Sequence, residues 1–417
     1  CSIRFWSANK KIHFQMSLSE APVSVPIASL YPQPEALNAE EFSESLINSY
    51  KEVTNRDLPL FIRRGVFNAQ IDFADAINRK KEMKPFYITL SITPTERLFN
   101  LRHIVMFQLA KELQEAFDCQ VIIHVLDTKA MLRDPSIKWN AVVENTKETI
   151  KDIMSFGFNA DKTVIVKNSE ALSLDYVYLC DLQRNATLGD FNKKFIDNDQ
   201  VSIALLDVIF QNACFAIPKY VAKIIPNYKE SRCLMLLRPS QKNIYDFVSS
   251  LNQCEKPMVI YGGFVPALQS GQKMPSLAAF ALGQNASKGG KAKNSMREYM
   301  SIYLKDPIKV ITTKLNKSAF SGGRDTIDEQ REKGANLEVD VPFYYIRIFE
   351  KDDAIFENIK RTYGPGELEE GNDKRMLTGN LKKVCSEIIT SIVKELQDKR
   401  AKITNEMIAE MTKIRTI

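Results

Sequence analysis

Three short apolar runs decide the fold: Phe86–Leu90 (FYITL), Gln120–Asp127 (QVIIHVLD) and Thr163–Asn168 (TVIVKN). Each is nearly continuously apolar and rich in β-branched residues, which is typical of strands buried on both faces of a parallel sheet. The segments between them, Leu98–Phe117 and Ile137–Phe156, have apolar residues at helical spacing. This alternation predicts an α/β fold with a doubly wound parallel sheet, in which ligands bind at the carboxyl ends of the strands.

The same alternation continues toward the C-terminus and then gives way to helices. Arg232–Leu237 and Lys256–Phe264 predict two more strands, with a helix over Asn243–Leu251 between them. Leu377–Ala401 and Thr404–Met411 have the spacing of helices. We therefore expect an all-helical domain to follow the sheet domain.

One polar, basic stretch, 284–297 (QNASKGGKAKNSMR), separates the two patterns and carries no acidic residue. We predict a flexible surface loop there. The expected organisation is an irregular N-terminal extension over 1–45, an α/β domain over 46–283, the basic loop over 284–297 and a helical domain over 298–417. Residues 1–15 lie ahead of Met16 and lack acidic residues; we interpret them as an upstream extension rather than an organelle transit segment.

Composition excludes several classes of protein. The chain has 417 residues with 57 Lys and Arg against 51 Asp and Glu, a net charge of +6, which argues against a histone-like or an acidic solvating chain. Its seven cysteines form no CxxC pair and it has only three histidines, so neither a zinc ribbon nor a His-rich metal site is expected. No apolar run reaches the ~20 residues that span a bilayer. We predict a cytoplasmic protein without a resident metal.

Four further segments carry a resemblance. They are Phe61–Tyr87 (beginning FIRRG), Val265–Met274 (VPALQSGQKM), Leu315–Phe343 (containing SGGRDTIDEQREKGANLEVDVPF) and Met376–Lys383 (MLTGNLKK). In order and spacing they resemble the eukaryotic-type tryptophanyl-tRNA synthetases, a class I aminoacyl-tRNA synthetase family. The resemblance implies a Rossmann-like catalytic domain, a helical anticodon-binding domain, a homodimer, and ATP with Mg, tryptophan and tRNA as ligands.

The family's HIGH-type signature is degenerate here. It supplies two histidines beside the phosphates of ATP and a glycine against adenine. At the matching place Asn100 replaces the first histidine, Arg102 replaces the glycine, and His103 is retained. Either Arg102 and His103 still hold a phosphate, or Arg102 reaches solvent from the helix face while His103 is partly buried. We favour the second interpretation.

The KMSKS-type loop is also reduced. Its matching residues are Lys273, Met274, Pro275 and Ser276, of which Lys273 aligns with the phosphate-contacting lysine. Pro275 fixes one backbone angle and removes an N–H group, which stiffens a loop that has to rearrange during catalysis.

The positions that match the family's tryptophan pocket have changed chemistry. After the first strand, the tyrosine and the glycines of the family are absent, and beyond the second strand His124 and Lys129 replace a glutamine and a glutamate. At ~4 Å and an effective dielectric near 20, a cation facing the substrate ammonium is repelled by about 4 kcal/mol. The candidate pocket residues are Thr89, Ser91, Thr93, His124, Lys129, Gln241 and Gln269.

The C-terminal match is dense in comparison. Ser321-Gly322-Gly323 predicts a turn, and Thr326 with Glu329 predicts a capping box for the next helix. The resemblance suggests Lys317, Arg324 and Lys382 as candidate tRNA-facing cations.

Three hypotheses remain for the function. The first is a pseudoenzyme that keeps the synthetase fold and tRNA or protein binding without aminoacylation activity. The second is a divergent but active tryptophan–tRNA ligase that uses His103, Lys273, Gln241 and Gln269 in rearranged roles. The third is a pocket that takes a different, acidic small molecule, given Lys129 and Arg102. We favour the first.

Overall fold

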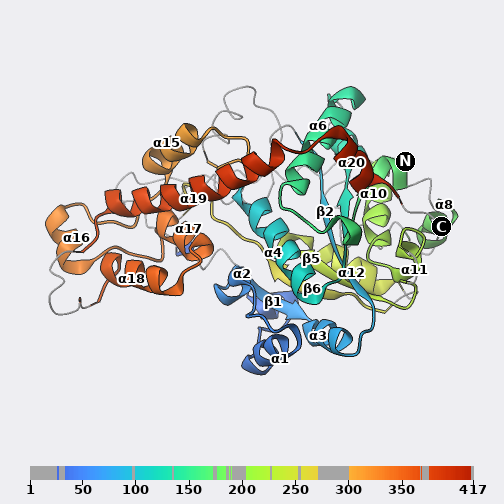
Figure 1. The fold of residues 1–417 in the computed structure, drawn as a ribbon, viewed down its shortest axis with the longest axis horizontal. Coiled ribbons are helices and arrows are strands. Elements are labelled where there is room, and N and C mark those ends of the chain that lie inside the picture. Colours follow the sequence, from blue (N-terminus) through green and yellow to red (C-terminus); the bar gives the residue numbers. More distant parts are fainter. Residues whose placement is uncertain are drawn as a thin grey trace, which may run out of the picture.

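The computed structural model describes residues 26–27, 33–95, 99–133, 136–171, 176–184, 187, 189, 203–225, 228–251, 255–270, 300–366, 368 and 375–414. Its centre is a six-stranded sheet in the order β1-β6-β5-β2-β3-β4, parallel except for the antiparallel pairing of β1 with β6 (Figure 1). The strands are β1 (Phe67–Ile71), β2 (Phe86–Ile92), β3 (Gln120–Val125), β4 (Thr163–Lys167), β5 (Arg232–Leu237) and β6 (Met258–Gly262). The expected α/β fold is confirmed.

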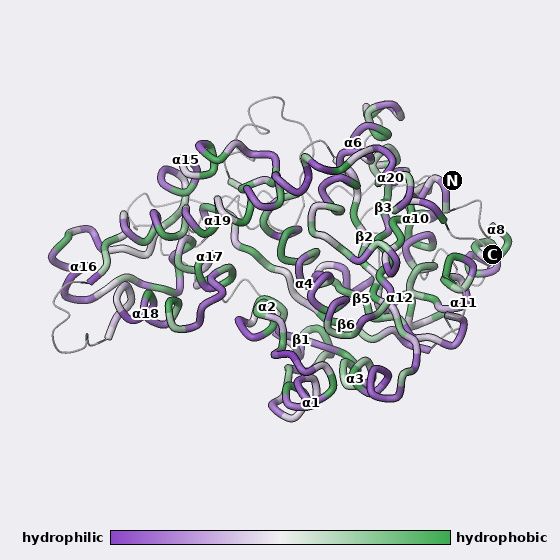
Figure 2. Tube along the Cα trace, viewed as in Figure 1, coloured by the Kyte–Doolittle hydropathy of each residue, from purple (hydrophilic) through white to green (hydrophobic). Residues whose placement is uncertain are grey.

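Helices cover both faces of the sheet. One core contains Phe107 of α4 and Phe156, which follows α6. The other contains Phe215, which follows α10, and Phe247 of α12. Figure 2 shows apolar residues along the sheet and the helix faces turned toward it. The helices around the sheet are α1 (Glu44–Thr54), α2 (Leu60–Arg63), α3 (Phe73–Lys81), α4 (Leu101–Phe117), α5 (Asp127–Arg133), α6 (Trp139–Met154), α7 (Asn168–Ala171), α8 (Tyr176–Gln183), α10 (Ile203–Cys214), α11 (Pro218–Val221) and α12 (Lys242–Ser250).

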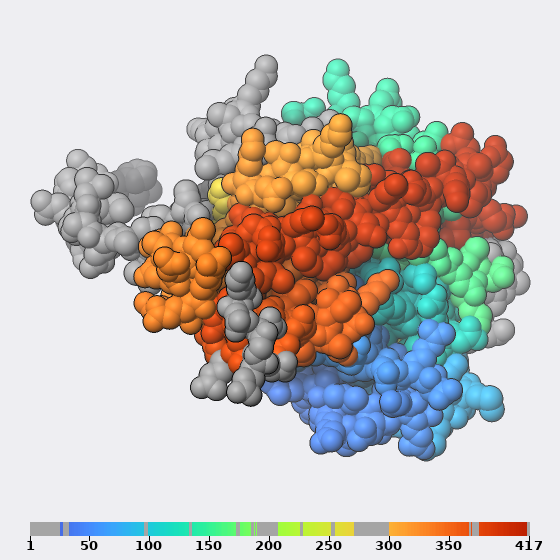
Figure 3. Space-filling model, turned by 60° about the vertical axis from the view of Figure 1, so that its left-hand side comes forward, coloured from blue at the N-terminus to red at the C-terminus, as the bar shows by residue number. Residues whose placement is uncertain are grey.

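The C-terminal part is helical, as expected. The long helix α19 packs against α15 and α17, and α20 then packs against β4 and α6 of the sheet part. Figure 3 shows this C-terminal segment running across the surface from the other C-terminal helices toward the sheet part. These helices are α15 (Ile308–Ser318), α16 (Ile327–Lys333), α17 (Val341–Phe349), α18 (Asp353–Tyr363), α19 (Thr378–Arg400) and α20 (Asn405–Thr412). In the described part of the chain, no helix has the length and apolarity needed to cross a membrane.

The sequence-based prediction differs from the structure in several strand details, among them the ends of β2, which extends to Ile92, and of β6, which is shorter than Lys256–Phe264. It missed β1, an edge strand in which apolar and polar residues are mixed. It also extended β3 and β4 too far, because Asp127 and Asn168 begin helices instead. Asp127 Oδ1 accepts hydrogen bonds from the backbone N of Thr128 and of Ser169, each at 2.9 Å, so one carboxylate ends both strands.

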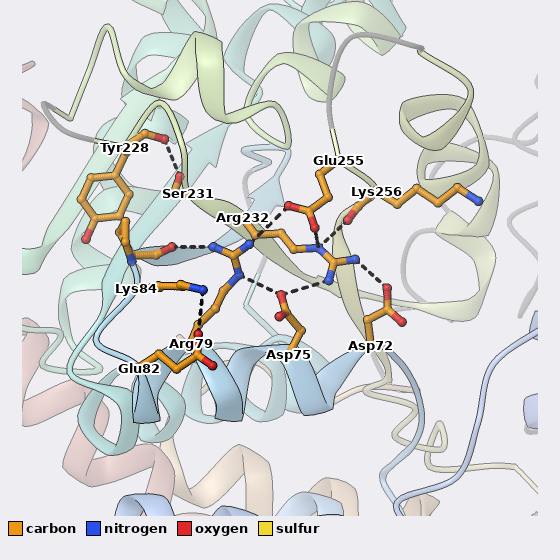
Figure 4. A network of polar contacts seen from close by, with 11 residues as sticks. Asp72, Asp75, Arg79, Glu82, Lys84, Tyr228, Ser231, Arg232, Glu255 and Lys256 are labelled. Carbon is orange, nitrogen blue, oxygen red and sulfur yellow. Dashed lines mark hydrogen bonds and ion pairs between the residues drawn. The ribbon is translucent and has the colours of Figure 1, made fainter.

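A buried arginine clamps the sheet to α3. Arg232, at the start of β5, has its Nη2 2.5 Å from Asp72 and its Nη1 3.0 Å from Asp75, and its Nε donates to the carbonyl of Lys256 (Figure 4). Only 7% of Arg232 is exposed. The strand was predicted from an apolar run, but its first residue, Arg232, forms ion pairs with α3 and the residue before it.

The FIRRG segment joins the sheet part to the C-terminal helices. Arg63 and Arg64 both pair with Asp353 of α18, at 2.8 and 2.5 Å. The Arg64 guanidinium lies 3.9 Å from the ring centre of Phe356. The backbone carbonyl of Arg64 accepts a hydrogen bond from the side chain of Arg347 at 3.0 Å. The segment that carries the family resemblance is therefore a structural joint in this chain.

A second joint, at the end of α19, leads to a pH prediction. Arg400 pairs with Asp152 at 2.5 Å and with Glu148, and Lys305 lies 3.2 Å from the same Glu148 carboxylate. Burial raises the pKa of Glu148, but the hydrogen bonds from Arg400 and Lys305 outweigh it and hold the pKa at about 2. A carboxyl group whose pKa is lowered by folding stabilises the fold when the pH is above its pKa in the unfolded chain, near 4.5. That contribution is lost as the pH falls toward 2.

Replacing Arg400 by glutamine is expected to move the pKa of Glu148 back toward its ordinary value, because the largest favourable contact is lost. A carbon-13 NMR titration of the Glu148 carboxyl measures this directly. The matched control is Lys399→Gln, which removes an exposed pair with Glu395 at 2.6 Å and should leave Glu148 unchanged. A Glu148 pKa that stays near 2 in R400Q would contradict the assignment.

Candidate functional site

Several of the residues singled out from the sequence lie on β2 and β3 or just beyond the ends of these strands. Thr89 is 6% exposed, and its Oγ1 donates to the carbonyl of Ile122 on β3 at 3.3 Å. Ser91 is half-buried opposite His124 in the β2–β3 register. The Thr89 hydroxyl therefore serves the sheet rather than a ligand.

Asn100 caps the helix that carries the degenerate HIGH-type residues. Its Oδ1 accepts from the backbone N of Arg102 at 3.1 Å and lies 2.9 Å from Nδ1 of His103. The backbone N of Asn100 lies 3.4 Å from the same Nδ1. Asn100 and His103 thus form a reciprocal capping box at the start of α4, which is the role expected of an asparagine just ahead of a helix.

This cap leaves no free backbone donor at the start of α4. The N–H of Leu101 donates to the carbonyl of Ile302 at 3.2 Å, that of Arg102 to the Asn100 side chain, and that of His103 to the Asn100 carbonyl at 2.9 Å. A helix N-terminus binds phosphate through such N–H groups. Because each already has an acceptor, α4 presents none to a phosphate.

His103 is half-buried, as the favoured interpretation expected. Burial lowers its pKa to about 3, and the charges of Arg238 and Arg102 add to that effect. The imidazole is therefore neutral at physiological pH, and it does not supply the positive charge that would hold a phosphate.

Arg102 is half-buried. The favoured interpretation expected this side chain to reach solvent, and the structure differs from it in this respect. Its Nε is buried and has no hydrogen-bond partner among the described residues. Burial lowers its pKa, and the groups that oppose this shift are the phenols of Tyr345 and Tyr303. Arg102 lines a cavity of about 240 Å³, counted to its open mouth, together with Pro266 and Tyr345.

His124 belongs to a buried polar cluster. It is 1% exposed, its Nε2 lies 2.9 Å from Asn168 Oδ1, and its ring centre lies 4.1 Å from that of Phe215. Asn168 in turn donates to Thr128 Oγ1 at 2.5 Å and to Gln211 Oε1. Burial lowers the pKa of His124 to about 3, although the hydrogen bond with Asn168 opposes the shift.

Sequence reasoning missed the partners in this cluster. Asn168, Gln211 and Phe215 line a second small cavity, among α7, α8, α10 and α11. Gln211 also donates to Asp207 Oδ2 at 2.5 Å. The available signal was three polar residues, Asp207, Gln211 and Asn212, inside the otherwise apolar stretch 203–217.

Arg238 was missed as well, although it directly follows β5. Its backbone N donates to Gln241 Oε1 at 3.0 Å, so the candidate pocket residue Gln241 caps a local turn. Lys129, Thr93 and Gln269 are half-buried. The Lys129 charge lowers the pKa of His124, which places another cation near this edge of the sheet.

The remaining predicted residues are spread over the chain. Lys382 Nζ donates to the carbonyls of Asn316 at 3.1 Å and Ala319 at 2.9 Å, so it caps α15, and Arg324 Nε donates to the Gly334 carbonyl at 2.8 Å. Lys317 is exposed on α15. Lys273, Met274, Pro275, Ser276 and the basic stretch 284–297 lie outside the described residues.

Known proteins identify the family. A cytoplasmic tryptophan–tRNA ligase of Arabidopsis thaliana is 31% identical over 387 residues, which cover 91% of this chain and 88% of the relative. The chain belongs to the tryptophanyl-tRNA synthetase family. The human cytoplasmic tryptophan–tRNA ligase is 28% identical over 89% of this chain and 74% of its own length. No protein-family model matches the sequence.

Solved structures of tryptophanyl-tRNA synthetases agree with this family assignment. The tryptophanyl-tRNA synthetase of Giardia lamblia is similar with a TM-score of 0.77 and 28% identity, over 91% of this chain and 94% of that one. A product-bound parasite tRNA synthetase is similar with a TM-score of 0.80 and 26% identity, over 93% and 96%. The fold is that of a class I synthetase, with its Rossmann-like sheet.

Among the described residues, no group of three or more His, Cys, Asp or Glu side chains could hold a metal ion. In this family Mg is associated with ATP, and the start of α4 is where the resemblance puts the phosphates. The backbone N–H groups described there do not fit the phosphates of ATP, because each already has an acceptor within the chain.

Proposed function

We propose that this chain is a tryptophanyl-tRNA synthetase homologue that does not form tryptophanyl-adenylate and that acts by binding. The observation that carries the proposal is the closed start of α4, where Asn100 and Ile302 accept the backbone N–H groups of Leu101, Arg102 and His103. Adenylate formation depends on donors and cations placed around the triphosphate. A helix that has satisfied its own donors contributes little to that stabilisation.

Changes on the tryptophan side support the same proposal. Thr89 stands where the family has a tyrosine, and its hydroxyl is bonded to β3. The buried pair His124–Asn168 uses the side chain at a position where the family has a glutamine. Lys129 brings a positive charge where the family has a carboxylate, and that charge repels the α-ammonium group of tryptophan.

The retained features support a binding role. The two ionic joints, Arg64–Asp353 and Arg400–Asp152, hold the helical part against the sheet part. We assign 298–417 as an anticodon-type domain, with tRNA or a protein as partner and Lys317 on its exposed side. By analogy with the family we place the chain in the cytoplasm as a homodimer.

The test is tryptophan-dependent exchange of pyrophosphate into ATP, with the Arabidopsis tryptophan–tRNA ligase as the positive control. We expect a rate at least about a thousandfold below the control, because a single misplaced charge of about 4 kcal/mol corresponds to that factor. Exchange within tenfold of the control would contradict the proposal and favour the divergent but active ligase.

A calorimetric titration with tryptophan separates loss of binding from loss of chemistry. The proposal expects no measurable heat of binding, because Lys129 and the His124–Asn168 pair occupy the recognition positions. Micromolar binding of tryptophan without pyrophosphate exchange would mean that the chain recognises tryptophan and fails only to bind or activate ATP.

A further inference from the structure

Strand β4 is the last strand on its side of the sheet, and its outer edge pairs with no other described strand. Because β4 pairs only with β3, one row of its backbone N–H and C=O groups points away from the sheet. In the described part of the chain, no hydrogen bond from outside the sheet reaches the backbone of residues 164–166. An edge with such a row of unpaired groups is open to pairing with a further strand unless another element covers it.

Helix α20 and the residues just beyond it cover this edge. Ile165 of β4 belongs to the core on one face of the sheet, where Ile408 and Met411 of α20 also pack. Val166 belongs to the core on the other face, against which Ile414 packs just beyond the end of α20. Since α20 also packs against β4 itself, the C-terminal segment passes from one face of the sheet to the other over the β4 edge. Figure 1 shows α20 at the end of α19, beside the sheet.

Apolar contacts hold α20 in place. Within the described chain, no ion pair or hydrogen bond joins residues 405–414 to another element. Met411 is the one buried residue of α20, and a helix of eight residues is marginal without more support. The end of α19, by contrast, is fixed by the ion pair between Arg400 and Asp152. Helix α20 can therefore leave the sheet by local opening while α19 stays in place.

We propose that α20 is a displaceable cover of the β4 edge, and that a protein partner takes its place by adding an extended peptide segment to β4. The inference rests on the proposed function, a chain that acts by binding, and it names the mode of binding. Backbone hydrogen bonds to the free row of β4 hold the added strand. Successive side chains of a strand point to opposite faces, so they fill the apolar space that Ile408 and Met411 leave on one face and Ile414 on the other. The partner segment is therefore apolar on both faces, as β4 is.

The probe is a labelled synthetic peptide with the sequence of residues 160–168 of this chain, ADKTVIVKN, whose β-branched centre lies between charged residues. Its binding to the full chain is measured by fluorescence anisotropy. Met411→Asp places a charge in the apolar contact and releases α20, so we expect the peptide to bind at least tenfold more tightly than to the wild type. Ile414→Asp acts on the opposite face and should have the same effect. The matched control is Met407→Asp, because Met407 is 46% exposed on the same helix and its variant should bind like the wild type.

Two modified peptides separate strand addition from binding in an apolar groove. A strand uses the backbone groups of alternate residues along each edge. One peptide is N-methylated at both valines, and the other at the threonine and the isoleucine. Strand addition predicts that one of them loses at least tenfold in affinity for M411D while the other binds like the unmodified peptide.

Hydrogen exchange of the wild-type chain tests the cover without any substitution. We expect the amides of residues 405–412 to exchange at least tenfold faster than those of residues 385–396 in α19, since α20 opens locally. Equal protection of the two segments would overturn the inference even if the variants failed to fold.

Three further results would overturn it. They are equal peptide binding by M411D, I414D and the wild type, equal binding of the two N-methylated peptides, and dimerisation of M411D without peptide, which would assign the edge to a second copy of the chain. None of these results bears on pyrophosphate exchange, so the proposed loss of adenylate formation stands or falls separately.

Discussion

Replacing Asp340 by alanine is expected to lower the free energy of unfolding by about 3–5 kcal/mol. The side chain is fully buried, and its Oδ2 accepts from Gly322 N at 2.8 Å, Ser321 Oγ at 2.9 Å and Tyr363 Oη at 2.7 Å. Its Oδ1 caps α17 by accepting from Phe343 N at 2.8 Å. Alanine would leave these buried donors without an acceptor, and urea denaturation measures the loss.

The matched control is Asp352→Ala. Asp352 also caps a helix, accepting from Ala354 N at 2.8 Å and Ile355 N at 3.1 Å, but it is exposed. Its loss should lower the free energy of unfolding by only about 1 kcal/mol. If both variants lost the same amount, Asp340 would not be the centre of the SGGRD turn.

Lowering the pH from 6.5 to 5 is expected to reduce the free energy of unfolding by about 2 kcal/mol through His124 alone. Its pKa is about 3 in the folded chain, because burial disfavours the imidazolium, and near 6.5 when unfolded. A lowered histidine pKa contributes stability above pH 6.5 and loses it as the unfolded chain takes up the proton. Well below pH 6.5 the free energy of unfolding falls by about 1.4 kcal/mol for each pH unit through this group.

The measurement is urea denaturation of the wild type and of His124→Gln at both pH values. Glutamine is uncharged and can keep a hydrogen bond to Asn168, so the variant should lack this part of the pH dependence. The difference between the two slopes isolates His124 from all other groups. Equal slopes would mean that the pKa of His124 is the same in the folded and the unfolded chain.

The central sheet could be predicted because its strands are buried on both faces. β2, β3 and β5 are nearly continuous apolar runs, which is a strong local signal for a buried strand. β1 could not be found, since an edge strand with Asn68 and Gln70 has no such run. The ends of β3 and β4 depended on the Asp127 carboxylate, whose contacts join residues 42 positions apart.

The candidate site was predictable only in part for a related reason. Asn100 was placed inside a predicted helix that began at Leu98, although an asparagine ahead of an apolar periodic stretch is a signal for a helix cap. The surroundings of Arg102 were not readable, because Tyr303 and Tyr345 come from segments about 200 residues later in the chain. The same applies to His124, because its partner Asn168, and Gln211 that accepts from Asn168, come close only through the fold.

The central claim is that the chain keeps the synthetase fold and has lost the chemistry of amino-acid activation. Active-site titration tests it most directly, by mixing the chain at high concentration with tryptophan and radiolabelled ATP and counting the adenylate formed per chain in the first turnover. We expect no burst above the background of a sample without tryptophan. A burst approaching one adenylate per chain would contradict the account, whatever the steady-state rate.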